Sequence, residues 1–292
     1  MIEQALYEHL VNQTALTDLL GCYAEKPAVF NQEAPADNDE KWEAGQQYGR
    51  IVFAVDIQGD PERAVGGTLA VDISCKEGEQ FPEEIEPVAR QLIHGYFFSS
   101  GNHVVAAQWK NSSYFTEPTE QVIGCTIAFE LLAFPIITTA DPDIIARINE
   151  WTASRFKSIH VINYDKLPAS AWKPTKSESA VYWRFVQDEP AGWIPDTFQT
   201  IWRTATVKCH IFSDTNAIAA SVAREITTRL YVDKRVMKSG ETPIMVNRRN
   251  SVDLAADPLR TGQVSVEATY AIVINYSPDS VLKNITYNRR RR

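Results

Sequence analysis

Apolar residues recur every three to four positions in four parts of the chain. In the first part, Ile2, Leu6 and Leu10 lie on one side of a helix, and a further short helical turn ends at Gly21. The same spacing predicts helices over residues 83–97, 141–156 and 216–231. The helix at 141–156 begins with Asp141 as N-cap and Pro142 at the first helical position. Each predicted helix has one apolar side, as expected of a helix packed on a sheet.

Apolar and polar residues alternate in other stretches, which predicts β-strands. Leu69, Val71 and Ile73 illustrate the pattern, and the turn signal "GDPE" before this strand predicts antiparallel pairing with the strand that precedes it. Strands are predicted at residues 50–58, 67–76, 103–111, 120–134, 180–187, 198–213, 242–249 and 262–276.

The predicted elements occur in one order twice: helix, loop, two strands, helix, two strands. The residues repeat with them, because Val-Ala-Arg occurs at 88–90 and again at 222–224, and Pro118 aligns with Pro258. We therefore expect an α+β protein of two tandem domains, each a mostly antiparallel sheet backed by helices. The predicted boundaries are 1–138 and 139–278, followed by a basic extension at 279–292.

Between Tyr23 and Gly49 the composition changes to Pro, Asp, Glu and Asn. This predicts an exposed acidic loop in which Phe30 or Trp42 is an isolated anchor. Long loops in compact domains usually have a function, and aromatic anchors with steering charges suit partner recognition. The candidate interface residues in this loop are Phe30, Asp37, Asp39, Glu40 and Trp42.

The net charge of −8 is unevenly distributed. Residues 1–140 hold 7 Lys and Arg against 21 Asp and Glu, whereas the remainder holds 22 against 16. Such a split favours subunits that stack or that face two different partners, because opposite charges orient docking. The alternative is that surface charge varies along the chain without a role.

Basic residues cluster at two places in the second half. Arg248 and Arg249 stand at the end of a predicted strand, and the sequence given ends in Arg289, Arg290, Arg291 and Arg292. The terminal run could be a solvated tail or a remnant of purification, or it could bind nucleic acid phosphates. We favour docking on an acidic protein surface such as the first half of a neighbouring copy, because no basic groove with aromatic residues accompanies the tail.

No local motif predicts chemistry. Gly66-Gly67 lacks the Lys and the following helix of a phosphate-binding loop, and the five histidines are not spaced as metal ligands. The four cysteines lie far apart in apolar contexts, which predicts reduced, buried thiols. We expect no enzyme, no catalytic or metal site and no cofactor; a hydrolase with a dispersed site and a nucleic-acid-binding module that uses the Arg tail remain alternatives.

The sequence also predicts a soluble protein made in the cytoplasm. No stretch approaches ~20 uncharged apolar residues, so no membrane partner is expected. Acidic residues occupy the start of "MIEQALYEHL", where a signal peptide would be basic.

Residues 1–135 resemble the tail-completion, or tail-terminator, proteins of long-tailed bacteriophages. The resemblance is carried by the first helix with its ending Leu16-x-x-Leu19-Leu20-Gly21, by "RIVFAVDIQGDPERAVGGTLAVDISC", and by "SSYFTEPTEQVIGCTIAFELLAF". Through the repeat it extends faintly to residues 141–276, although the family usually has a single domain.

The resemblance implies a structural protein of the virion. Such proteins form a ring, usually a hexamer, that caps the tail tube and joins the tail to the head. The expected partners are further copies of the chain, the tail tube protein and head–tail connector or neck proteins, with DNA passing through the ring without specific binding. Another neck or tail-tube component is the alternative within this class.

Overall fold

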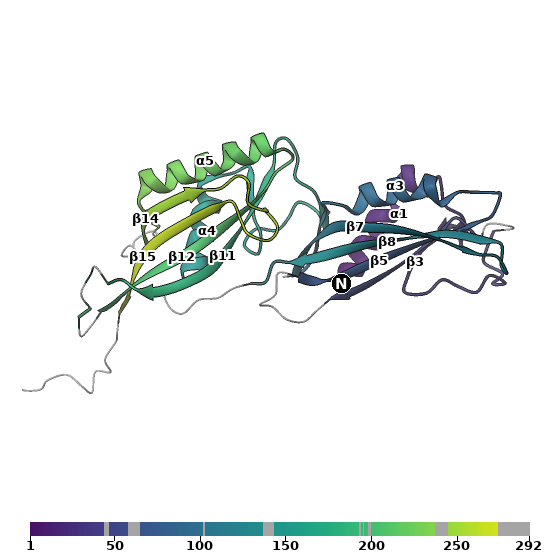
Figure 1. Ribbon diagram of the computed structural model, residues 1–292, viewed down its shortest axis with the longest axis horizontal. Helices are drawn as coiled ribbons and strands as arrows, with labels where there is room; N and C mark the ends of the chain where they lie inside the picture. Colours follow the sequence, from purple (N-terminus) through teal and green to yellow (C-terminus); the bar gives the residue numbers. More distant parts are fainter. Residues whose placement is uncertain are drawn as a thin grey trace, which may run out of the picture.

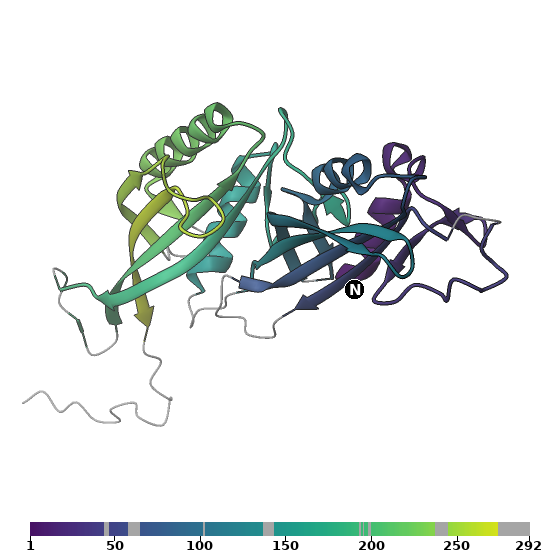
Figure 2. The same ribbon diagram turned by 45° about the vertical axis from the view of Figure 1, so that its right-hand side comes forward.

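The fold is α+β, with two sheets along the long axis of the molecule and helices packed on one face of each sheet (Figures 1 and 2). The computed structural model describes residues 1–43, 47–57, 65–101, 103–136, 143–192, 194, 196–197, 200–236 and 245–273. The helices are α1 (Ile2–Val11), α2 (Thr14–Thr17), α3 (Pro82–Ile93), α4 (Ile144–Arg155) and α5 (Asn216–Asp233).

The strands form one two-stranded, one seven-stranded and one six-stranded sheet. Strands of the first half are β1 (Cys22–Tyr23), β2 (Lys26–Pro27), β3 (Val29–Asn31), β4 (Arg50–Ile57), β5 (Val65–Lys76), β6 (Phe97–Ser100), β7 (His103–Glu117) and β8 (Val122–Ala133). Strands of the second half are β9 (Ile159–Val161), β10 (Ala171–Trp172), β11 (Ser179–Pro190), β12 (Thr200–Phe212), β13 (Arg235–Val236), β14 (Met245–Val252) and β15 (Val264–Val273).

The two large sheets share one strand order. The seven-stranded sheet runs β10-β6-β7-β8-β5-β4-β3, and the six-stranded sheet runs β13-β14-β15-β12-β11-β9. Apart from the added β10, each strand of the first sheet has a counterpart at the same position in the second sheet. In each sheet the described strands pair antiparallel except for the last pair, which is β3 with β4 in the first and β9 with β11 in the second. The repeated Val-Ala-Arg lies on α3 and α5, where Ala89 and Ala223 are both fully buried against their sheets.

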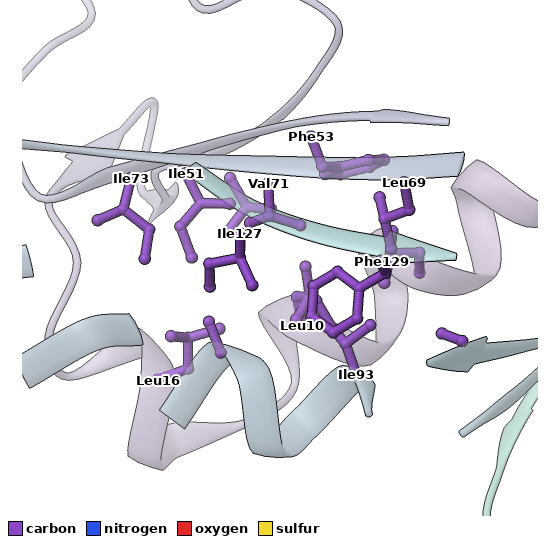
Figure 3. Packing of buried hydrophobic residues seen from close by; sticks show 14 of the residues in the cluster. Leu10, Leu16, Ile51, Phe53, Leu69, Val71, Ile73, Ile93, Ile127 and Phe129 are labelled. Atoms are coloured by element: carbon purple, nitrogen blue, oxygen red, sulfur yellow. The ribbon is translucent and has the colours of Figure 1, made fainter. Parts of the chain in front are cut away.

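Each sheet has its own apolar core beneath its helices. In the first half, Leu10 of α1 and Ile93 of α3 pack on the strands, as Figure 3 shows. Leu6 of α1 belongs to the same cluster. Each fully buried Leu, Ile or Phe side chain contributes about 1.5–3 kcal/mol relative to an exposed one. The strand residues of this core include Ile51, Phe53, Leu69, Val71, Ile73, Ile127 and Phe129.

Several predicted boundaries differ from the structure. The helix predicted over residues 83–97 ends at Ile93, and Phe97 begins strand β6. The third strand extends to Glu117 rather than 111, because β7 keeps pairing with β8 after a bulge at Trp109 and Asn111. The helix after the first sheet begins at Ile144, and its N-cap is Asp143, whose Oδ1 accepts a hydrogen bond from Ala146 N at 3.0 Å. The N-cap is therefore Asp143 and not the predicted Asp141. Residues 141 and 142 themselves lie outside the described residues.

The two sheets meet at an aromatic cluster, here called the junction. Phe97 and Phe134 of the first half pack against Phe212 and Tyr182 of the second, with ring centroids 5.0 Å apart for Phe97–Phe212 and 5.2 Å for Phe134–Tyr182. In addition, β10 pairs antiparallel with β6, so a piece of the second half completes the first sheet. The halves are therefore joined by both side-chain packing and backbone pairing.

Candidate interface surfaces

In its described residues, the loop between Tyr23 and Gly49 contains more regular structure than the sequence predicts. Its first part forms the β1–β2 hairpin and strand β3, and Trp42 is only 7 % exposed. The Trp42 ring lies 4.9 Å from Tyr23 and 5.6 Å from Phe30, and its Nε1 donates to the Ala36 carbonyl at 3.0 Å. The prediction of an isolated exposed anchor was wrong for Trp42, because the three aromatic rings of the loop pack on one another.

The acidic residues of the same loop have local partners. Asp37 accepts hydrogen bonds from Arg50 and from the Tyr48 hydroxyl, and Asp39 accepts from the Tyr23 hydroxyl at 3.0 Å. Partial burial tends to raise the pKa of Asp37, but the bonds from Arg50 and Tyr48 outweigh it and the pKa lies below its usual value. Of the predicted charges, Glu40 is exposed and leaves its carboxylate to solvent or a partner.

The predicted arginine pair lies inside a strand rather than at its end, because the strand continues to Val252. Arg248 and Arg249 belong to β14, where a bulge between Asn247 and Arg249 interrupts pairing with β15. Both side chains are exposed, and Arg249 lies opposite Glu267 in the ladder. Arg289, Arg290, Arg291 and Arg292 lie outside the described residues, so their docking stays a prediction.

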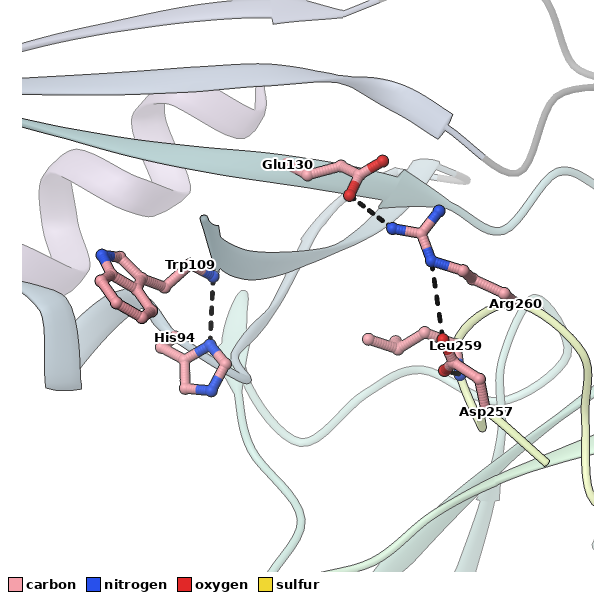
Figure 4. A network of polar contacts seen from close by, with 6 residues as sticks. All are labelled: His94, Trp109, Glu130, Asp257, Leu259 and Arg260. Carbon is pink, nitrogen blue, oxygen red and sulfur yellow. Dashed lines mark hydrogen bonds and ion pairs between the residues drawn. The ribbon is translucent and has the colours of Figure 1, made fainter. Parts of the chain in front are cut away.

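A polar network crosses the junction, and no local motif in the sequence predicts it. Arg260 Nη2 donates to Glu130 Oε2 at 2.5 Å, and Arg260 Nε lies 3.5 Å from Asp257 (Figure 4). Glu130 is only 7 % exposed and belongs to β8 of the first sheet, whereas Arg260 belongs to the loop at residues 253–262. This loop therefore ties the second sheet to the first.

A buried histidine forms a hydrogen bond to the 253–262 loop. His210 of β12 is 2 % exposed, and its Nδ1 lies 2.7 Å from the Pro258 carbonyl, to which the neutral ring donates. Nε2 has no hydrogen-bond partner and lies against Gly262, where an added Cβ would be 3.2 Å from it. Burial is the main cause that lowers the pKa of His210 to about 4, with Arg184 and Lys208 acting in the same direction.

Next to the junction lies a cleft of about 220 Å³ between the two halves. Its walls include His94 and Gly95 after α3, Leu259 of the loop, and Thr215 and Asn216 at the start of α5. His94 Nδ1 accepts from Trp109 N at 3.1 Å, as Figure 4 shows, so this ring is occupied in a structural contact. Among the residues that the structure describes, no group of three or more His, Cys, Asp or Glu side chains could hold a metal ion.

The cysteines are unpaired thiols in this structure. Cys75, Cys125 and Cys209 are buried, whereas Cys22 is partly exposed. Burial is the main cause that raises the pKa of Cys75 to about 12 and of Cys125 to about 11, so these thiols stay protonated near neutral pH.

In the described part of the chain, no helix combines the length and the apolarity needed to span a membrane. No protein-family model matches the sequence, and no curated protein matches it either.

Proposed function

We propose that this chain is a structural protein of a tailed phage or phage-tail-like particle. In this proposal two tandem tail-terminator-like domains assemble with further copies into a ring at the head-proximal end of the tail. The ring ends the tail tube and contacts the tube protein on one face and the connector or neck proteins on the other. DNA passes through its centre without specific contacts.

The observation that carries the proposal is the repeated sheet. One strand order occurs twice around two separate cores, and the parallel edge pair recurs at the same place in each. The N-terminal residues that resemble the tail-terminator family lie in the first of these units. Duplicated units joined by a packed junction suit a wall segment, because each unit supplies a rigid sheet and two faces of loops.

The uneven charge supports stacking or end-to-end contact between copies. The first half carries an excess of carboxylates and the second an excess of Lys and Arg. Opposite charges on different parts of one chain favour an ordered contact between copies over a random one. Arg289–Arg292 are proposed to dock on a neighbouring acidic surface.

Electron microscopy of the purified protein, combined with light scattering, tests the proposal. Rings, or caps on tubes formed when the matching tail tube protein is added, are the expected result. Removal of Arg289–Arg292 should lower the salt concentration at which the assembly dissociates. A monomer at every concentration, with no effect on tube length, would contradict the ring.

A nucleic-acid-binding role makes a different prediction. Arg248 and Arg249 are exposed on β14, and phosphate contacts weaken as salt rises because bound counterions are released. Salt-dependent binding of the monomer to duplex DNA, lost in Arg248→Ala/Arg249→Ala, would favour that role over the ring.

A further inference from the structure

The outer ends of α3 and α5 point in opposite directions along the long axis of the molecule (Figure 1). The C-terminal end of α3 and the N-terminal end of α5 line the same cleft beside the junction, through His94 and Asn216. From there α3 extends for 12 residues and α5 for 18. At 1.5 Å per residue these lengths are about 18 Å and about 27 Å. Figure 1 shows the two helices over different sheets, so their far ends point away from the junction.

The outer end of α3, here called the α3 end, is acidic and carries exposed aromatic rings. We define it as Glu79, Phe81, Glu83, Glu84 and Tyr114. Phe81, the N-cap of α3, and Tyr114 of β7 are each 51 % exposed. Ser112 Oγ donates to Glu86 of α3 at 2.6 Å, and Tyr114, two residues along β7, lies on the same face of the strand. The α3 end therefore combines apolar surface with three exposed carboxylates.

The surface from the middle of α5 to its outer end, together with Arg155 of α4, is here called the α5 end; it is basic and also carries exposed apolar side chains. We define it as Arg155, Arg224, Arg229, Tyr231, Val232 and Lys234. Tyr231 is 71 % and Val232 is 64 % exposed. Asp233 accepts from Arg155 Nε at 3.0 Å and lies 3.8 Å from Arg229 Nε, so it holds two of the cations in place.

A groove of about 580 Å³ runs between α4 and the α5 end. Its walls include Arg155, Phe156, Arg224, Arg229 and Val232, and three cations outnumber the one carboxylate among them, that of Glu225. An aromatic side chain of a partner can enter such a groove while carboxylates beside that side chain meet the arginines. Interfaces are enriched in aromatic residues and Arg in their centre, and these two ends supply both kinds.

We propose that copies of this chain bind end to end, the α5 end of one copy against the α3 end of the next. The two ends have opposite charge. Each also carries large exposed apolar side chains, which the contact would remove from water. Because the two surfaces differ, the contact is heterologous, and its repetition produces a closed ring or an open filament. This inference rests on the proposed function and names the surfaces that would form its ring.

Charge reversal at each end tests the contact. The variant Glu83→Arg/Glu84→Arg disables the α3 end, and Arg224→Glu/Arg229→Glu disables the α5 end. By light scattering, each variant alone should be monomeric where the unaltered chain is an oligomer. An equimolar mixture of the two should restore a large assembly of alternating variants, because the two intact ends are complementary and the two reversed ends are again opposite in charge. All four changes in one chain should restore the large assembly.

Two controls separate the contact from general effects. Glu33→Arg and Lys176→Glu change exposed charges outside both ends and should leave the oligomer unchanged. Tyr231→Ser/Val232→Ser removes apolar surface but keeps the pairs at Asp233, and it should also give monomers with unchanged circular dichroism. Loss of assembly in this variant therefore does not depend on the arginine substitutions.

The outcomes distinguish this inference from the proposed function. If the unaltered chain assembles and either end variant assembles equally well, the end-to-end contact is wrong and the ring stands on other surfaces. If both variants are monomeric but their mixture is too, the two ends do not bind each other and the inference is overturned. If the unaltered chain is monomeric at every concentration, both proposals fail.

Discussion

Arg260 and Glu130 form an ion pair at 2.5 Å across the junction of the two sheets, although 130 positions separate them in the sequence. Glu130 is almost completely buried, whereas the Arg260 side chain is 43 % exposed. The pair connects a loop of the second half to a central region of the first sheet (Figure 4). It therefore contributes to holding the halves in one orientation.

Arg260→Ala should lower the free energy of unfolding by about 1–3 kcal/mol, because a buried carboxylate then lacks its charged partner. Chemical denaturation measures this loss. Glu130→Gln/Arg260→Ala should recover part of it, since the amide carries no charge to desolvate. Lys76→Ala, which breaks an exposed pair with Glu79, should cost about 0.5 kcal/mol or less. Equal losses for Arg260→Ala and Lys76→Ala would contradict a role for the junction pair.

His210 should make the protein less stable in acid. Its pKa falls from the usual 6.5 to about 4 in the folded protein, so the unfolded chain binds a proton first as the pH drops. Stability is full above pH 6.5 and decreases between pH 6.5 and 4, by about 2–3 kcal/mol from this group. Urea denaturation across this range measures the slope. His210→Gln should flatten it.

Trp42 should stabilise the loop that the sequence assigned to partner contact. Trp42→Ala removes a buried ring from the cluster with Tyr23 and Phe30 and should cost about 3 kcal/mol. Trp42→Phe keeps most of the packing and should cost clearly less. Glu40→Ser, by contrast, should leave thermal stability unchanged because the side chain is exposed. A weakened assembly in Glu40→Ser at unchanged stability would identify a contact role for this carboxylate.

Gly124 should not tolerate a side chain. It lies in β8, where an added Cβ would be 2.4 Å from the Ile73 carbonyl oxygen and 2.3 Å from the Phe115 ring. Phe115 can move, but the backbone of the neighbouring strand cannot, so Gly124→Ala should cost about 2 kcal/mol or more. Gly192→Ala is the matched control, because nothing lies within 4 Å of its added Cβ. Similar melting temperatures for the two variants would show that the sheet adapts.

The sequence alone was sufficient for the type and order of the main elements. Helical spacing in "PVARQLIHGYF" and alternation in "GTLAVDISCK" are local patterns, and each one reports which side of an element is apolar. The same local information predicted that the order of elements occurs twice, and the two large sheets share one strand order. The predicted order of the main helices and strands along the chain agrees with the order in the structure.

Only the tertiary structure decided which polar and aromatic residues meet. Trp42 looks like a surface anchor in an acidic stretch, yet it is buried because the chain turns back so that Tyr23 and Phe30 cover it. His210 and Pro258, and Glu130 and Arg260, are brought together by strand pairing and by packing at the junction. Such contacts depend on the path of the whole chain, and no periodic pattern within a short window records that path.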